Sequence, residues 1–276
     1  MGRRTARVPS TRLDLATGAV VRRPDTVAVE EPLEIRVGEA SLTTTMRTPG
    51  DDFDLTLGHL VTEGLVHDGA EVRGLMHCTD TGPDGSPTFN VVDVTLAPGA
   101  TLHGPPRERA ETMTSACGIC GTASIDAIRL AARFAVAADP TTLDPAVVAS
   151  LPERLHAEQA TFDRTGGVHG AALFTAAGEL LVAREDVGRH NAVDKVIGWA
   201  VRERRLPLAG TVLAVSARAS FEIVQKALMA GIPAVVAVSA PSSLAVALAT
   251  ETGMTLVAFT RPPRLVVYAG EHRLTS

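Results

Sequence analysis

Cys117 and Cys120 stand in the run Cys-Gly-Ile-Cys-Gly, a spacing that suits thiol chemistry. We expect a helix to begin just behind the pair, and its positive dipole end lowers the pKa of a nearby thiol and raises the thiolate fraction. The flanking glycines leave the backbone free to change conformation, so the segment is suited to a mobile loop. These features favour a sulfur or acyl carrier whose thiolate reaches into the site of another protein.

Three other interpretations of the same pair stay open at this point. A zinc half-site would need two more ligands, and the sequence has no second Cys-x-x-Cys to supply them. A thioredoxin-type redox pair is disfavoured because no predicted strand leads into the motif. Plain packing of two small residues in a loop is the simplest interpretation. The remaining zinc-ligand candidates are Cys78 and one of three histidines: His156, His169 and His190.

The run His156-Ala-Glu158, taken with a Cys-x-x-Cys, is similar to the signature of zinc nucleobase deaminases. In those enzymes the His-x-Glu precedes Pro-Cys-x-x-Cys, whereas here the order is reversed and Ala116 stands where proline is expected. A helix predicted over 145–162 accounts for His156 and Glu158 as solvated residues. We therefore expect neither deaminase activity nor the catalytic zinc that it requires.

Arginines gather where predicted strands end in the second half of the chain. Arg218, Arg261 and Arg264 are the three candidates. Guanidinium groups pair with phosphates in a bidentate manner, so these residues predict a polyanionic ligand. The sequence has neither a Walker loop nor a Gly-x-Gly-x-x-Gly before a helix, so it gives no support for ordinary ATP or NAD binding.

Two further segments carry ionisable residues at predicted junctions. His169 follows Gly-Gly-Val just before a strand, where a histidine is either a structural hydrogen bonder or a functional group. The run 185–195, which contains His190, lies between a predicted strand and a helix. Solvated surface is one interpretation of this run. The other is that Gly188, at the helix start, presents backbone N–H groups to an anion.

Lysine usage sets two positions apart. The chain has 26 Lys and Arg residues together, and only Lys195 and Lys226 are lysines. A protein that otherwise uses arginine for positive charge places a compact ammonium with three donors at these two positions. We expect both lysines to have specific roles.

The last third of the chain alternates strands and helices. Strands are predicted over 211–216, 234–239 and 254–259, with helices over 220–230 and 242–252 between them. Such a βαβαβ run with short connections predicts a parallel sheet covered on both faces, with ligands bound beyond the carboxyl ends of its strands. The uncharged stretch 227–250 is long enough to cross a bilayer, but Gly231 and two prolines interrupt it. We expect a soluble strand and helix there, and no membrane contact.

The sequence divides into four segments. We expect a flexible basic arm over 1–26, an N-terminal α+β portion over 27–106, a mobile loop with both cysteines over 107–124, and an α/β domain over 125–276. The elements predicted before the βαβαβ run are strands over 33–37, 42–46, 71–77, 88–96, 171–175 and 180–184 and helices over 51–66, 125–138, 145–162 and 191–205.

Composition excludes several classes of protein. The net charge of −5 and an aromatic content of 3 % argue against a nucleic-acid binder. Three cysteines are too few for a disulfide framework and odd in number, which is typical of a reducing compartment. No apolar stretch follows the N-terminal arginines as a signal peptide would require. A cytoplasmic protein is expected.

Taken together, these residues resemble the FdhD family of sulfur carrier proteins, accessory sulfurtransferases for formate dehydrogenase. The likeness covers roughly residues 25–270, and the Asp-Val-Gly-Arg-His-Asn-Ala-Val-Asp-Lys run is its most specific part. One departure is Ala217, where the family pattern has glycine before the arginine. A methyl group there narrows the backbone approach of a ligand. The segments that carry the resemblance are 115–121, 166–169, 185–195, 220–226 with 230–233, and 237–246.

The resemblance implies a function, a fold and partners. The protein would accept persulfide sulfur from a cysteine desulfurase and pass it to the molybdenum or tungsten bis(molybdopterin guanine dinucleotide) cofactor before insertion into formate dehydrogenase. The implied fold is a three-layer α/β core similar to cytidine deaminases, without their zinc. A homodimer in the cytoplasm is also implied. A non-enzymatic cofactor chaperone and a zinc hydrolase are the alternatives.

The family's site residues transfer by position. Cys117 matches the persulfide-bearing cysteine and Cys120 its partner. The cofactor-binding stretch matches Phe259, Thr260, Arg261, Pro262, Pro263 and Arg264. Arg218, His169, His190 and Lys195 are further candidates, which either line the cofactor pocket or brace it.

Overall fold

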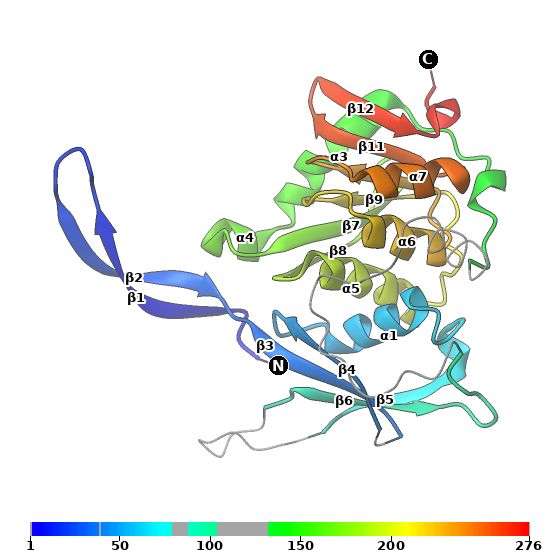
Figure 1. Cartoon of the computed structure of the whole chain (residues 1–276), viewed down its shortest axis with the longest axis horizontal. Helices are drawn as coiled ribbons and strands as arrows, with labels where there is room; N and C mark the ends of the chain where they lie inside the picture. The colour runs from blue at the N-terminus through cyan, green and yellow to red at the C-terminus, as the bar shows by residue number, and fades with distance from the viewer. Residues whose placement is uncertain (1, 39, 79–87, 104–131, 276) are drawn as a thin grey trace.

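The computed structural model describes residues 2–38, 40–78, 88–103 and 132–275, and within them it contains three β-sheets and the helices that cover them (Figure 1). The largest sheet has six strands in the order β12-β11-β10-β9-β7-β8. Its central strands β9, β10 and β11 are parallel, and every other neighbouring pair in it is antiparallel. The strands are β7 (His169–Thr175), β8 (Leu180–Asp186), β9 (Thr211–Val215), β10 (Ala234–Ala237), β11 (Thr255–Arg261) and β12 (Arg264–Ala269).

Helices cover both faces of this sheet. Alternate residues of a strand point to opposite faces, so Leu213 and Val215 of β9 pack against one helix layer while Val212 and Ala214 pack against the other. One layer contains α5 (Arg189–Arg202), α6 (Phe221–Met229) and α7 (Ser243–Glu251); the other contains α3 (Pro145–Ala157). The predicted three-layer α/β core and its βαβαβ run are confirmed. Strand β12 was not predicted.

The N-terminal portion forms a separate sheet with one helix on it. The sheet has the order β4-β3-β6-β5, and α1 (Asp52–Thr62) lies between this sheet and α5 (Figure 1). Leu55 of α1 packs on the sheet residues Leu33 and Val92. The predicted α+β composition of this portion is confirmed. Its strands are β3 (Glu31–Val37), β4 (Ala40–Arg47), β5 (Val72–Cys78) and β6 (Val91–Leu96).

Helices α1 and α5 cross at two glycines. A Cβ atom on Gly58 would lie 1.9 Å from the carbonyl oxygen of Asp194, and one on Gly198 would lie 1.7 Å from that of Asp54. Both distances are far below van der Waals contact, so only glycine allows the two backbones to approach this closely. The crossing joins the N-terminal portion directly to the α/β domain.

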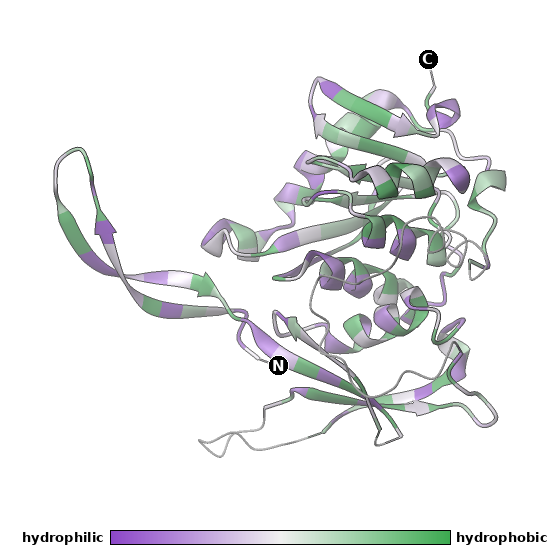
Figure 2. Ribbon diagram, in the orientation of Figure 1, coloured by the Kyte–Doolittle hydropathy of each residue, from purple (hydrophilic) through white to green (hydrophobic). Residues whose placement is uncertain are grey.

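The N-terminal arm, predicted as a flexible segment over 1–26, contains two regular strands. Strands β1 (Thr5–Leu13) and β2 (Val20–Ala28) pair along their full length as an antiparallel hairpin that projects from the body (Figure 1). Its turn is closed by Asp14, whose carboxylate accepts hydrogen bonds from the backbone N–H groups of Ala16 and Thr17. These hydrogen bonds lower the pKa of Asp14. Figure 2 shows hydrophobic residues along both strands, of which Leu13 and Val20 are exposed.

Two predicted helices differ from the structure. The helix expected over 145–162 is divided into α3 and α4 (Ala160–Thr165), because the carboxylate of Glu185 accepts hydrogen bonds from the N–H groups of Thr161 and Phe162 and so fixes a new helix start. The helix expected over 125–138 is not formed in its described part, 132–138, which has only a 3-10 turn. There the carbonyl of Val136 accepts a hydrogen bond from Arg273. Residues 125–131 lie outside the described residues.

Among the described residues, no helix is both long enough and apolar enough to cross a membrane.

Candidate functional site

A pocket of about 790 Å³ lies at the edge of the six-stranded sheet where its parallel strands end. Ser216 follows β9, Val238 follows β10, and Thr260 and Arg261 end β11. Because β7 runs antiparallel to β9, its first residue, His169, lies at the same edge. The opposite wall comes from α3 and α4. The expectation that the carboxyl ends of the parallel strands form a binding site is therefore consistent with a real cavity at that edge.

The start of β7 is held in place next to this cavity. The N–H of Gly170 donates to the hydroxyl of Ser216 at 2.9 Å, and the N–H of Ser216 donates to the carbonyl of Gly170 at 3.0 Å. Gly170 has no side chain, and a Cβ atom there would lie 2.7 Å from the amide of Gln159. Because position 170 is glycine, the Gln159 amide can pack against its backbone in the pocket wall.

The surroundings of His169 in this pocket favour the neutral imidazole. Burial and the nearby charge of Arg189 lower the pKa of His169 below its usual range. A neutral ring has one donor and one acceptor nitrogen, so His169 is suited to hydrogen bonding with a polar ligand and not to pairing with a phosphate as a cation.

Two buried polar atoms of the pocket wall have no hydrogen-bond partner among the described residues. They are the amide nitrogen Nε2 of Gln159 and the hydroxyl of Thr260. Gln159 is 3 % exposed and Thr260 is fully buried. A buried polar group without a partner costs about 1–3 kcal/mol, so a ligand that supplies an acceptor for Gln159 and a partner for Thr260 gains binding energy. With the guanidinium of Arg261 beside them, these residues fit a polar, anionic ligand such as a nucleotide.

The stretch from Phe259 to Arg264 forms the tip of the β11–β12 hairpin. Phe259 has a positive φ of 49° at a register shift in β11, and its side chain is 48 % exposed. Arg261 and Arg264 are register partners across the hairpin, and both are exposed. Thr260, Arg261 and Pro262 line the pocket. Phe259, Pro263 and Arg264 belong to the same tip but do not line it.

The other candidates among the described residues lie outside the pocket lining. Arg218 is exposed two residues after Ser216. Ala217, the departure from the family pattern, is 6 % exposed, so its methyl group is directed into packed surroundings.

His190 lies at the start of α5, in the helix layer opposite α3. Its Nε2 is 3.3 Å from the hydroxyl of Ser220 and 3.7 Å from the carboxylate of Glu222. Burial, together with the charges of Arg189 and Lys226, lowers the pKa of His190 to about 4. The ring is therefore neutral at physiological pH.

Both lysines of the chain are buried in ion pairs. Lys195 is fully buried with its ammonium 2.7 Å from Asp186, and it does not reach the pocket. Lys226 lies 3.0 Å from Asp194 and 3.2 Å from Glu63. Burial opposes the ammonium of Lys226, but these two carboxylates outweigh it and raise the pKa. Both lysines therefore stabilise the fold, and the expectation that Lys195 lines or braces a cofactor pocket stays a prediction.

Sequence reasoning did not identify Gln159 or the capping role of Glu185. The helix predicted over 145–162 includes Gln159. The sequence feature that relates to its position is Gly170, whose lack of a side chain makes room for the Gln159 amide. Cys117 and Cys120 lie outside the described residues. Cys78, at the end of β5, is a half-buried free thiol.

Comparisons with known proteins point in one direction. The model of the FdhD/NarQ family matches residues 28–275. The chain is 56 % identical over 275 residues to the sulfur carrier protein FdhD of Streptomyces avermitilis, covering 99 % of this chain and 97 % of that protein. It is 54 % identical over 260 residues to the protein of the same name from Mycolicibacterium paratuberculosis, covering 94 % and 96 %.

A solved structure is similar as well. A protein from Desulfotalea psychrophila, described as a formate dehydrogenase accessory protein, superposes with a TM-score of 0.76 and 26 % sequence identity. The match covers 99 % of this chain and 100 % of that chain.

Proposed function

Because this chain belongs to the FdhD/NarQ family, we propose that it is a sulfur carrier that serves as an accessory protein for formate dehydrogenase. The observation that carries this proposal is the identity of more than half of its residues to a named sulfur carrier over nearly the full length of both chains. The finer steps below rest on the cysteine pair and on the pocket at the sheet edge.

In the first step, the thiolate of Cys117 attacks the terminal sulfur of a persulfide on a cysteine desulfurase. A bond forms between Cys117 and that sulfur, the sulfur–sulfur bond of the desulfurase breaks, and the desulfurase cysteine leaves as a thiolate. One persulfide is exchanged for another, so no external oxidant or reductant is needed.

In the second step, the carrier delivers the sulfur to its substrate, the molybdenum bis(molybdopterin guanine dinucleotide) cofactor. The thiolate of Cys120 attacks the inner sulfur of Cys117, which forms a disulfide and releases the terminal sulfur as hydrosulfide for the metal. The two cysteines are oxidised as the transferred sulfur is reduced, and a cellular thiol then restores both cysteines.

The pocket supplies the binding site for that cofactor. Arg261, with Arg264 and Arg218 nearby, provides positive charge for phosphate groups. Neutral His169 and the unpaired groups of Gln159 and Thr260 offer hydrogen bonds to a base or sugar. His190 and Lys195 support this surface from the α5 side. The proposed setting is a homodimer in the cytoplasm.

Mass spectrometry tests the carrier step. The protein is incubated with an active cysteine desulfurase and cysteine, and sulfur added to the peptide with Cys117 and Cys120 is measured. We expect added sulfur that is lost in Cys117→Ala and retained in the matched variant Cys78→Ala. If no sulfur is added while the desulfurase is active, the alternative of a cofactor chaperone without sulfur transfer replaces this proposal.

A further inference from the structure

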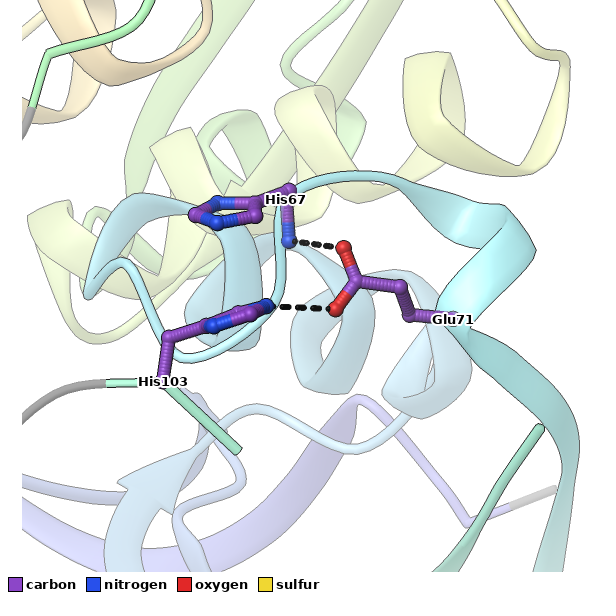
Figure 3. Close-up of side chains that lie close together, drawn as sticks. All are labelled: His67, Glu71 and His103. Carbon is purple, nitrogen blue, oxygen red and sulfur yellow. Dashed lines mark hydrogen bonds and ion pairs between the residues drawn. The ribbon is translucent and has the colours of Figure 1, made fainter. Parts of the chain in front are cut away.

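Two histidines and one glutamate meet in the N-terminal portion, outside the pocket (Figure 3). One ligand atom each of His67, Glu71 and His103 lies within 4.8 Å of the other two. We propose that these three side chains form a binding site for one divalent transition-metal ion, with Zn²⁺ as the preferred ion.

The backbone brings the three residues together before any ion binds. His67 follows α1, Glu71 ends the 3-10 helix Gly69–Glu71, and His103 follows β6. The N–H of His103 donates to the carbonyl of Leu65 at 2.9 Å, and the N–H of Ala97 donates to the carbonyl of Glu71 at 2.8 Å. These hydrogen bonds hold the segment 65–71 against the segment 97–103.

The side chains already contact one another. One carboxylate oxygen of Glu71 lies 2.8 Å from Nε2 of His103, and the other accepts the backbone N–H of His67 at 2.9 Å (Figure 3). The two imidazole rings are stacked with their centroids 3.8 Å apart. Two charged rings would repel each other at this distance, so the stacking disfavours a cluster in which both imidazoles are protonated.

The charges around the cluster act in the same direction. Burial, the neighbouring His103 and the guanidinium of Arg133 lower the pKa of His67, although the carboxylates of Glu71 and Asp68 oppose them. Burial disfavours the charged form of Glu71, but the hydrogen bonds from His67 and His103 outweigh it and lower the pKa of Glu71. These shifts favour the uncharged ring of His67 and the ionised carboxylate of Glu71, the forms that bind a metal ion.

The donor set indicates which ion would bind. Two imidazoles and one carboxylate are a known ligand set for zinc with three protein ligands, which leaves a fourth position for water. Zinc–nitrogen bonds of about 2.0–2.1 Å place tetrahedral ligand atoms about 3.3 Å apart, so the imidazoles must rotate to close the present spacing. All three residues are half-buried, and this leaves room for that rotation and for entry of the ion.

Binding would also change how Glu71 is used. One of its oxygens would leave Nε2 of His103 and bind the ion. The other would still accept the backbone N–H of His67, and this hydrogen bond would orient the carboxylate, as hydrogen-bond partners orient the ligands of other metal sites. The ion would then clamp 65–71 to 97–103. The proposed ligands include none of the residues from which the absence of zinc was expected, namely Cys117, Cys120, His156 and Glu158.

Zinc titration of a cysteine-free chain tests the proposal. Cys78, Cys117 and Cys120 are replaced by serine so that no thiol can bind the ion, and the full chain is stripped with a chelator. Calorimetry with Zn²⁺ and visible absorption with Co²⁺ then report stoichiometry and ligand geometry. We expect one equivalent bound, and a rise in melting temperature with zinc.

Single variants assign the ligands. In the same background, His103→Ala and Glu71→Gln should each weaken zinc binding by at least about tenfold. His272→Ala, an exposed histidine in the C-terminal turn, should leave it unchanged. Circular dichroism confirms that each variant is folded. Absence of saturable binding, or binding that His103→Ala leaves intact, overturns the site. The test needs no sulfur transfer, so its outcome is independent of the proposed function.

Discussion

The ammonium of Lys195 donates a hydrogen bond to the carbonyl of Thr48 at 2.8 Å while it pairs with the buried carboxylate of Asp186. The same carboxylate accepts the N–H of Thr48 at 3.1 Å. Thr48 follows β4, whereas Lys195 is in α5 and Asp186 ends β8. One buried ion pair thus joins the N-terminal sheet to the α/β domain through the backbone of a single residue.

Replacing only Lys195 should destabilise the protein strongly. Lys195→Met leaves the Asp186 carboxylate buried without a counter-charge, which lowers the free energy of unfolding by about 3–5 kcal/mol. Urea denaturation followed by circular dichroism measures this loss. The double variant Lys195→Met/Asp186→Asn should recover part of it, because no unpaired charge remains. Equal stability of the single variant and the wild type would contradict a structural role for the pair.

A methyl group at the helix crossing should force α1 and α5 apart. Gly198→Ala places a Cβ atom against the carbonyl oxygen of Asp54, and such overpacking costs about 1–3 kcal/mol or more of the free energy of unfolding. Gly74→Ala is the matched control, because a Cβ atom at Gly74 meets no other atom within 4 Å. Thermal denaturation of both variants measures the difference. Similar melting temperatures for Gly198→Ala and Gly74→Ala would argue against the close crossing.

Arg261 should contribute to binding of an anionic ligand in the pocket. Arg261→Ala removes a charged hydrogen-bond donor worth about 1.5–3 kcal/mol, equivalent to a roughly 10- to 100-fold weaker Kd. Guanosine diphosphate is a suitable probe in calorimetry because it carries the base and phosphates of the proposed cofactor. Arg22→Ala, in the exposed hairpin, should bind the probe as the wild type does. Undiminished affinity in Arg261→Ala would remove this residue from the proposed site.

Removing the hydroxyl of Thr260 should weaken ligand binding without lowering the stability of the folded protein. Thr260→Val has nearly the same shape and deletes a buried polar group without a partner among the described residues, so the free energy of unfolding should stay equal or rise by about 1 kcal/mol. Affinity for guanosine diphosphate should fall at the same time. A loss of stability instead would show that the hydroxyl has a structural partner.

The depressed pKa of His190 predicts that the protein loses stability in acid. The folded protein has a pKa of about 4 at this ring, below the value of about 6.5 in the unfolded chain. Between these values the unfolded chain binds more protons, so the stabilisation present above pH 6.5 is lost as the pH falls towards 4. The free energy of unfolding should drop by up to about 3 kcal/mol over this window.

His190→Gln should flatten that pH dependence, because glutamine does not titrate and the folded and unfolded chains then bind the same number of protons at this position. His272→Gln removes an exposed histidine and should keep the wild-type slope. Urea denaturation at several pH values between 4 and 7 gives both slopes. A His190→Gln slope equal to that of the wild type would assign the acid sensitivity to other groups.

The sequence predicts the parts of this fold that depend on local pattern. Buried strands alternate with helices after residue 211, and this pattern predicts the βαβαβ run. It also predicts the sheet edge at which the pocket lies. The break between α3 and α4 cannot, because the carboxylate that starts α4 is that of Glu185, more than twenty residues later in the chain. The place of Gln159 in the pocket depends on that break.

The run 185–195 shows the same limit at the site. Its residue types indicate importance, but they do not separate a ligand contact from a brace. Lys195 pairs with Asp186 of the same run and donates to the distant carbonyl of Thr48, and Asp194 pairs with Lys226. Only the tertiary structure shows these contacts. The place of His169 at the pocket likewise depends on the antiparallel pairing of β7 with β9, which the sequence pattern does not show.

The glycine crossing of α1 and α5 also has a consequence for how the protein can be divided. With no side chains between the two backbones at Gly58 and Gly198, each helix covers backbone of the other that would otherwise face water. A shortened chain that begins after the N-terminal sheet would expose the apolar face of α5 and the carbonyl of Asp194 to water. We expect such a fragment to aggregate, and the whole chain to unfold in one cooperative transition. Expression trials of the α/β domain should therefore retain α1.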